Sequence, residues 1–210
     1  MPIRITNLIK NFSAGNVKTP VRTAVLNVPG FELADGDQVA LVGKSGGGKS
    51  TLLNVIAGIV TADSGEVMIN STDITQLSEP ARDTFRAANI GYVFQTFNLI
   101  QGLTAMENVI LAMSFAGKVK NMEARAKELL SLVGLAEKLA NKPRELSVGQ
   151  QQRVAIARAV ANEPQLILAD EPTANLDEAS SDLVITLLKK VCSESGRMLI
   201  LVTHEREVAA

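Results

Sequence analysis

Three short runs of uninterrupted apolar residues stand out along the chain, at residues 39–42, 166–169 and 199–202. Runs of this length without polar alternation are typical of strands that are covered on both faces in a parallel sheet. Small or polar residues follow each run at once. Because ligands bind at the carboxyl ends of the strands in open α/β sheets, the three ends predict one shared binding site.

Between these runs, apolar residues recur at the spacing of a helix. Two stripes with i, i+3, i+4 spacing are Val184, Leu187, Leu188 and Val191 in one segment and Leu129, Leu132 and Val133 in another. Gly134 is placed to end the second helix. Residues 104–162 contain helical patterns and no clear strand. Alternation before residue 36 predicts antiparallel strands, with turns at residues 14–16 and 35–37.

The composition fits one folded domain. The chain has 210 residues, of which 46% are hydrophobic, so it can form a sizeable core and is not a disordered protein. Its formal net charge of -1 argues against a nucleic-acid partner bound through a basic surface. Cys192 and His204 are the only cysteine and the only histidine, which excludes an intramolecular disulfide framework and a zinc cluster.

No segment of the sequence predicts export or a membrane span. The first residues lack the apolar core of a secretory signal, and no run approaches the roughly 20 apolar residues that span a bilayer. We therefore expect a soluble cytosolic domain, for which any work at a membrane requires a partner chain.

Residues 43–50 match the phosphate-loop pattern G-x-x-x-x-G-K-[ST] at every fixed position, between the first apolar run and a predicted helix. Glycines let backbone N–H groups converge on phosphate oxygens, and the helix N-terminus adds positive potential. Lys49 then reaches the β- and γ-phosphates, and the Ser50 hydroxyl binds Mg²⁺. A flexible glycine-rich turn is the alternative. The residues predicted to hold the nucleotide here are Gly43, Ser45, Gly46, Gly47, Gly48, Lys49, Ser50 and Thr51.

Two carboxylates, Asp170 and Glu171, directly follow the second apolar run. After a phosphate loop, Asp170 is the natural partner of Mg²⁺, and Glu171 is the candidate base for an attacking water. In isolation the pair is a weak signal, because a strand often ends in a solvated acidic turn. The phosphate loop is what favours the chemical interpretation.

Ser147 and Gln150 form the S-x-x-Q pattern of a capping box at the start of a helix, which by itself says nothing about function. The surrounding segment Leu146-Ser-Val-Gly-Gln-Gln-Gln-Arg153, however, resembles the signature of ATP-binding-cassette (ABC) ATPases. The motifs that share this resemblance occur in family order along essentially the entire chain. They are the phosphate loop, Gln95, Ser147–Gln150, Asp170-Glu171, Asp177 and His204.

The resemblance implies an α/β fold in which a P-loop NTPase core sheet carries an N-terminal antiparallel β subdomain and an inserted helical subdomain. One ABC ATPase domain then covers residues 1–210. Residues 1–94 and 165–210 form its nucleotide-binding core lobe, and residues 95–164 form a helical lobe with the signature motif. The implied activity is ATP hydrolysis, with ATP and Mg²⁺ as cofactors.

The resemblance also implies roles for single residues. Gln95 contacts Mg²⁺ and the attacking water, and it joins Ser50 and Asp170 as a metal ligand. His204 bonds the γ-phosphate and positions Glu171. For Gln95, an ordinary polar residue at a strand end is the alternative, and for His204 a satisfied structural histidine. The implied catalytic set is Glu171, His204, Gln95 and Lys49.

Two further positions belong to the nucleotide site by resemblance. Phe12 stands where an aromatic ring stacks on adenine, an interaction of roughly 1–3 kcal/mol that tolerates Phe in place of the more usual Tyr. Asp177 belongs to a loop that communicates across a dimer. Core packing is the alternative for Phe12, and a solvated helix start is the alternative for Asp177.

Family members form ATP-dependent head-to-tail dimers, and this resemblance implies a second copy of the chain as a partner. Ser147, Gly149 and Gln150, with the free N–H groups of their helix, would read the γ-phosphate presented by the other copy. Val148 stands where the signature usually has Gly, and its β-branched side chain restricts the backbone. We expect this departure to weaken capture of the γ-phosphate.

Residues 90–99, 103–109 and 168–177 look like the lipoprotein-release and macrolide-export subgroup. Its ATPases act on integral membrane permease subunits, which implies a peripheral position on the cytoplasmic face of the inner membrane. The stretch Phe97–Asn108, after Gln95, is where the family contacts those subunits. The apolar residues expected to make this contact, unless they are merely core, are Leu99, Ile100, Leu103 and Met106.

Other functions stay open beside export or mechanotransmission. One is an ATP-gated regulatory switch that acts on a membrane-bound hydrolase without transport. A soluble ABC machine for translation or DNA repair would need a second cassette or a long coiled coil. A small-molecule kinase would leave Ser147–Gln150 unexplained. The chain ends at Ala210, where the family usually continues, so we expect a truncated or shortened member. Nothing in the sequence identifies a cargo.

Overall fold

The computed structural model describes residues 3–14 and 21–204, which form two sheets and the helices that pack on them. The strands are β1 (Ile3–Ala14), β2 (Val21–Leu33), β3 (Gln38–Val42), β4 (Ser64–Ile69), β5 (Thr72–Asp73), β6 (Ile90–Val93), β7 (Leu166–Asp170) and β8 (Met198–Thr203). The α-helices are α1 (Lys49–Ile56), α2 (Glu79–Asn89), α3 (Ala105–Ala116), α4 (Met122–Leu132), α5 (Val148–Ala159) and α6 (Glu178–Ser193). Short 3-10 turns cover Ile74–Gln76, Ala136–Lys138 and Pro143–Glu145.

The three apolar runs form β3, β7 and β8 of a parallel sheet, as predicted, and the strand order of that sheet is β3-β8-β7-β6. β7 and β8 are buried on both faces, whereas β3 is an edge strand whose Val42 is 44% exposed, so the predicted burial of this run is only partly met. Leu166 and Leu168 of β7 face the core that contains α1, whereas Ile167 and Ala169 face the core that contains α3 to α6. Period-2 alternation between two buried faces explains why the runs carry no polar positions.

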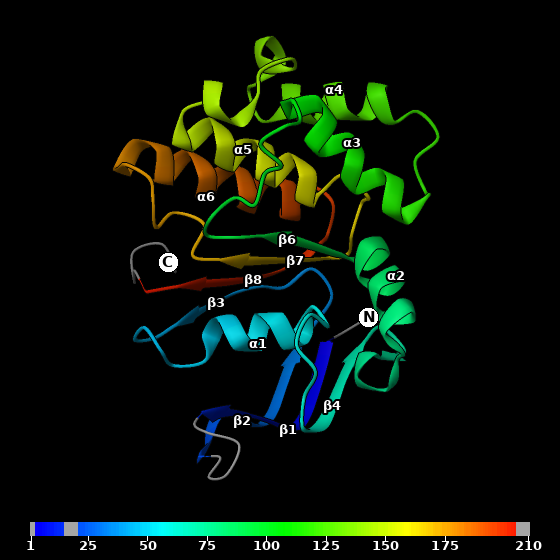
Figure 1. The fold of residues 1–210 in the computed structure, drawn as a ribbon, viewed down its shortest axis with the longest axis vertical. Helices are drawn as coiled ribbons and strands as arrows, with labels where there is room; N and C mark the ends of the chain where they lie inside the picture. The colour runs from blue at the N-terminus through cyan, green and yellow to red at the C-terminus, as the bar shows by residue number, and fades with distance from the viewer. Residues whose placement is uncertain (1–2, 15–20, 205–210) are drawn as a thin grey trace.

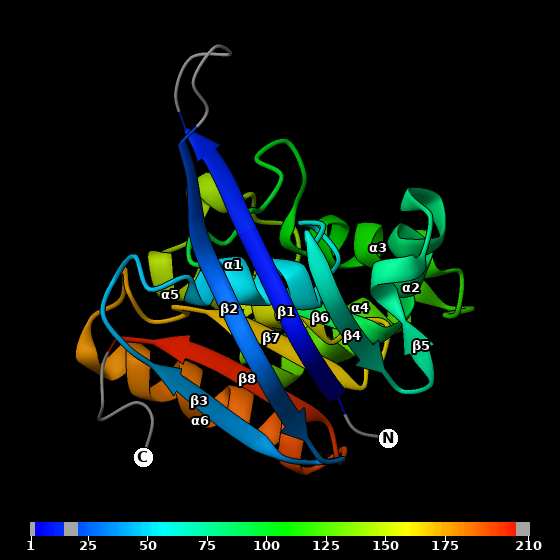
Figure 2. The same ribbon diagram turned by 90° about the horizontal axis from the view of Figure 1, so that it is seen from below.

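Helix α1 lies between this sheet and a second, antiparallel sheet with the order β2-β1-β4-β5 (Figures 1 and 2). The antiparallel strands predicted before residue 36 are confirmed as β1 and β2. The turn at residues 35–37 forms around Gly36, whose φ of 78° is left-handed. Most of the predicted turn at residues 14–16 lies outside the described residues. Strands β4 and β5 join from beyond the predicted segment.

Helices α3 to α6 cover the other face of the parallel sheet (Figure 1). The stripe of α6 is buried as predicted, but that of α4 differs. Leu129 and Val133 are buried, whereas Leu132 is 44% exposed and Leu130 takes its place in the core. The buried arc of α4 is therefore one residue off the predicted stripe, because α4 packs against both α3 and α5. Gly134, with φ 70°, follows the helix end as predicted.

Residues 95–164 share a continuous core with the parallel sheet, since Val109 and Ile156 belong to the same buried cluster as Ile167 and Leu199. The boundaries of the two lobes, at residues 94 and 165, stay a prediction. Within residues 3–14 and 21–204, no helix combines the length and the apolarity that a membrane crossing requires.

Candidate functional site

The phosphate loop joins β3 to α1, and its backbone depends on glycine. Gly46 and Gly48 adopt φ values of 79° and 80°, in the left-handed region that L side chains rarely occupy. A Cβ atom on Gly48 would also lie 2.6 Å from the carbonyl oxygen of Val25 in β2. Because Gly48 precedes the first turn of α1, the loop ends on helical N–H groups that suit an anion.

Lys49 folds back across this loop. Its Nζ donates hydrogen bonds to the carbonyl oxygens of Gly43 at 2.7 Å and of Lys44 at 2.9 Å. These two bonds place the ammonium over the loop. Lys49 therefore lies where the β- and γ-phosphates of a bound nucleotide are expected.

The loop and the end of β7 meet through Ser50 and Asp170. The Ser50 hydroxyl donates to Asp170 Oδ1 at 2.9 Å. Burial raises the pKa of the Asp170 carboxyl, and the nearby charge of Glu171 raises it further, while the Ser50 bond opposes both. Two oxygen ligands at one point, close to the phosphate loop, fit Mg²⁺, which prefers oxygen and takes its remaining ligands from phosphate and water.

Glu171 and His204 stand together at the ends of β7 and β8. His204 Nδ1 lies 3.2 Å from Glu171 Oε2. Glu171 has a left-handed φ of 44°, and its backbone N–H donates to the carbonyl oxygen of Val202 at 2.9 Å. A non-glycine residue in this region is strained by about 1–3 kcal/mol, and the bond to β8 holds it there. The carboxylate is thereby fixed beside the phosphate loop.

Gln95 reaches the same edge of the sheet. It lies two residues beyond β6, in which Val93 pairs with Ala169, so it is level with the residues that end β7. Its carbonyl oxygen accepts a hydrogen bond from Asn175 Nδ2 at 3.1 Å, and its side chain is exposed. The structure thus gathers Lys49, Ser50, Gln95, Asp170, Glu171 and His204 at the carboxyl ends of parallel strands.

The signature segment forms the predicted capping box at the start of α5. The Gln150 side chain accepts from the Ser147 N–H at 2.9 Å, and the Gln150 N–H donates to Ser147 Oγ at 3.3 Å. Val148 is 44% exposed in the first turn. Gly149 approaches α6, because a Cβ there would lie 3.1 Å from Ser180 Oγ.

Asp177 caps α6 next to this segment. Its carboxylate accepts from the Ser180 N–H at 2.9 Å and from the Ser180 hydroxyl at 2.8 Å, and these bonds lower its pKa. Ser180 thus links Asp177 to the signature helix. Both lie on the sheet face opposite α1, so they form a second group, separate from the residues around the phosphate loop.

Phe12 lies near the end of β1 with 44% of its surface exposed, so it is not the core residue that the alternative requires. Lys10 Nζ stands 5.4 Å from the centre of its ring. This distance is within the range of a cation–π contact.

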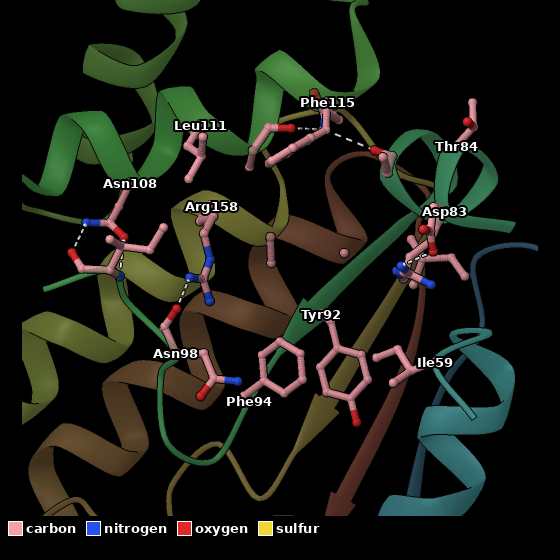
Figure 3. Close-up of a pocket in the computed structure, with 18 residues that line it drawn as sticks. Ile59, Asp83, Thr84, Tyr92, Phe94, Asn98, Asn108, Leu111, Phe115 and Arg158 are labelled. Carbon is pink, nitrogen blue, oxygen red and sulfur yellow. Dashed lines mark hydrogen bonds and ion pairs between the residues drawn. The ribbon is translucent and has the colours of Figure 1, made fainter. Parts of the chain in front are cut away.

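The stretch after Gln95 is only partly available for a partner. Leu99 is 7% exposed and belongs to the core, and Met106 packs against that core, so for these two the core alternative is correct. Leu103 is half-buried. Ile100, at 48% exposure, lines a groove of about 620 Å³ between α2, α3 and the segment after β6 (Figure 3).

Arg158 is a residue of this groove that the sequence does not single out. Its guanidinium donates to the carbonyl oxygen of Asn98 at 2.5 Å (Figure 3) and to that of Phe97 at 2.6 Å. Phe97 and Asn98 have left-handed φ values of 57° and 49°. Burial lowers the pKa of Arg158. The side chain joins α5 to the turn after Gln95, and no local sequence pattern indicates a bond across 60 residues.

Comparison with known proteins bears on this arrangement. The family model described as ABC transporter matches residues 26–174. The lipoprotein-releasing system ATP-binding protein LolD of Geobacter metallireducens is 42% identical over 209 residues, which cover 99% of this chain and 91% of that protein. The macrolide export ATP-binding/permease protein MacB of Syntrophobacter fumaroxidans is 41% identical over 210 residues, which cover 99% of this chain and 29% of that protein.

A solved structure supports the same relationship. The dimeric ATP-binding cassette MJ0796, bound to ADP and Pi in a post-hydrolysis state, is 40% identical and superposes with a TM-score of 0.90. The match covers 99% of this chain and 90% of that one.

Proposed function

This chain belongs to the family of ABC transporter ATPases, and from that premise we propose that it hydrolyses ATP as a head-to-tail dimer to drive a membrane permease. We propose that this hydrolysis drives export or mechanotransmission, as in the lipoprotein-release and macrolide-export subgroup. The protein is then a peripheral protein on the cytoplasmic face of the inner membrane.

The residues of the site have separate roles in hydrolysis. Lys49 and the N–H groups of the phosphate loop hold the β- and γ-phosphates. Ser50, Asp170 and Gln95 would hold Mg²⁺, which when bound neutralises charge on the phosphate oxygens. Glu171 accepts a proton from the attacking water, and His204 keeps that carboxylate in place from a distance of 3.2 Å.

One observation supports the dimer: the parallel sheet separates the two groups that suit an anion, the phosphate loop and the signature segment. Helix α1 follows the phosphate loop on one face, and α5 begins with the signature segment on the other. One chain therefore holds its phosphate loop and its signature segment apart, next to helices on opposite faces of the parallel sheet. A γ-phosphate can meet both groups only if the second comes from another copy, and the relative MJ0796 is a dimer.

The groove of about 620 Å³ is the proposed contact with the permease. Three large apolar side chains stand exposed around it: Ile59 at 47%, Ile100 at 48% and Phe115 at 70%. A helix from the membrane subunit would cover them, because exposed apolar patches of this kind mark interaction sites. As its name states, the relative MacB combines an ATP-binding part with a permease.

Light scattering on the Glu171→Gln variant tests the dimer. With ATP and Mg²⁺ bound and not hydrolysed, we expect its mass to double from that of the 22.3 kDa chain, and to return to it with ADP. Adding Ser147→Arg should abolish dimerisation, since a bulky cation then occupies the signature end. Ser131→Arg on the exposed side of α4 is the matched control and should leave the dimer intact. A Glu171→Gln chain that stays monomeric with saturating ATP contradicts the proposal.

A further inference from the structure

Asp63, in the loop before β4, binds three consecutive residues near the end of β1. Its Oδ2 accepts from the Asn11 backbone N–H at 2.6 Å and from Asn11 Nδ2 at 3.1 Å, and its Oδ1 accepts from Lys10 Nζ at 3.1 Å. The N–H of Asp63 donates to the Ile9 carbonyl oxygen at 2.9 Å. One residue thus fixes both the backbone and the side chains of this stretch.

The bound stretch coincides with a β-bulge. Lys10 pairs with Leu26 and Asn11 pairs with Ala24, which leaves Val25 of β2 without an opposite residue. The carbonyl oxygen of this extra residue is the atom that packs against Gly48 of the phosphate loop. The bulge therefore sets the position of β1 relative to the phosphate loop, and Asp63 holds the bulge.

Phe12 is the next residue along β1, and the Lys10 ammonium lies over its ring. Lys10 Nζ stands 5.4 Å from the ring centre, while the Lys10 side chain is 15% exposed and is held by Asp63. Phe12 as a whole is 44% exposed. The ring thus meets a fixed ammonium and is accessible in part, as stacking of an aromatic ligand requires.

We propose that Asp63 is a positioning residue for the nucleotide base: through Lys10 and the Asn11 backbone it holds the ring of Phe12 in the position in which adenine stacks on it. The inference rests on the proposed role of Phe12 in the nucleotide site. Asp63 does not itself contact the base. Its carboxylate acts by fixing the bulge and by keeping the ammonium over the ring.

The charge of Asp63 matters to this role. Hydrogen bonds from the Asn11 N–H and from Lys10 hold the pKa of the carboxyl below its ordinary value, so it is ionised at neutral pH. Bonds to a charged acceptor are stronger than neutral ones. An Asn at this position keeps the shape and loses the charge.

The test is to compare a ligand that has a base with one that lacks it. Titration of ADP into the full chain measures both subsites, and tripolyphosphate measures the phosphate loop alone. We expect Asp63→Asn to lower the affinity for ADP about 3- to 10-fold, which is a fraction of the stacking contribution. The affinity for tripolyphosphate should not change. Lys10→Met should act in the same direction. Asp73→Asn is the matched control, because Asp73 also caps local groups, those of Thr75, and lies away from Phe12.

A double-mutant cycle identifies the route of the effect. In the Phe12→Ala background, Asp63→Asn should no longer change ADP affinity, because there is no ring left to position. The inference is overturned if Asp63→Asn still lowers ADP affinity in that background, or if it lowers the affinities for tripolyphosphate and ADP equally. Either result leaves the base site of Phe12 in place. If Phe12→Ala alone binds ADP normally, the base site fails and the inference fails with it.

Discussion

At the scale of single residues, the backbone of the site is held as firmly as its side chains. Glu171 keeps a left-handed φ because its N–H bonds to β8, and His204, on that same strand's end, meets its carboxylate. The proposed base and the histidine that positions it are therefore held by one pair of strands. Removing the carboxylate should stop the chemistry without moving the loop that holds ATP.

We expect Glu171→Gln to slow hydrolysis by about 100-fold or more, the scale of a lost general base, while ATP affinity stays close to that of the wild type. Single-turnover phosphate release and equilibrium titration measure the two quantities separately. Glu194→Gln, at the exposed end of α6, is the matched control. A near-normal rate in Glu171→Gln would remove Glu171 from its assigned role.

At the scale of elements, helix starts are fixed by side chains close in sequence. The capping box at Ser147 was predicted and forms, and Thr104 with Glu107 makes a second one at the start of α3. Hydrogen bonds from the Thr104 N–H and hydroxyl lower the pKa of Glu107. These bonds are local, so no distant contact is needed to form them.

This lowered pKa predicts a pH dependence of stability. The Glu107 carboxylate stabilises the fold fully above the ordinary value of 4.5, and this contribution is lost as the pH falls through the lower pKa of the folded state. Glu107→Gln should therefore lower the free energy of unfolding at pH 7, and its difference from the wild type should shrink towards pH 3. Urea unfolding across this range measures it, with exposed Glu66→Gln as the control. A difference that is constant with pH would contradict the assignment.

At the scale of the whole molecule, the groove depends on packing between segments far apart in the chain. Asn162 Nδ2 bonds the carbonyl oxygens of Ala87 and Ala112, which joins α2 to α3, and Arg158 joins α5 to the turn after Gln95. The groove is thus connected both to the signature helix and to the segment that carries Gln95. A partner bound in the groove would therefore be connected to the signature helix and to the Gln95 segment.

Phe115 is the groove residue to change, because it is 70% exposed and its loss leaves the core intact. We expect Phe115→Ser to reduce recovery of a permease from detergent-solubilised native membranes at least about tenfold, since an interface anchor contributes roughly 2 kcal/mol. ATP hydrolysis by the isolated chain should not change. Leu183→Ser, on exposed α6 surface, is the control. Equal recovery by both variants would place the permease elsewhere.

Local sequence patterns were enough to predict the parallel strands, the phosphate loop, the capping box and the carboxylates at a strand end. Each of these follows from periodicity or from short-range geometry, which neighbouring residues encode. The tertiary structure alone decided which face of α4 is buried, that β4 joins β1, and that Asp63 and Arg158 bind backbone 52 and 60 residues away. Such contacts depend on how the elements pack. The apolar pattern of a helix or strand indicates which face is buried, but it does not indicate which element packs against that face.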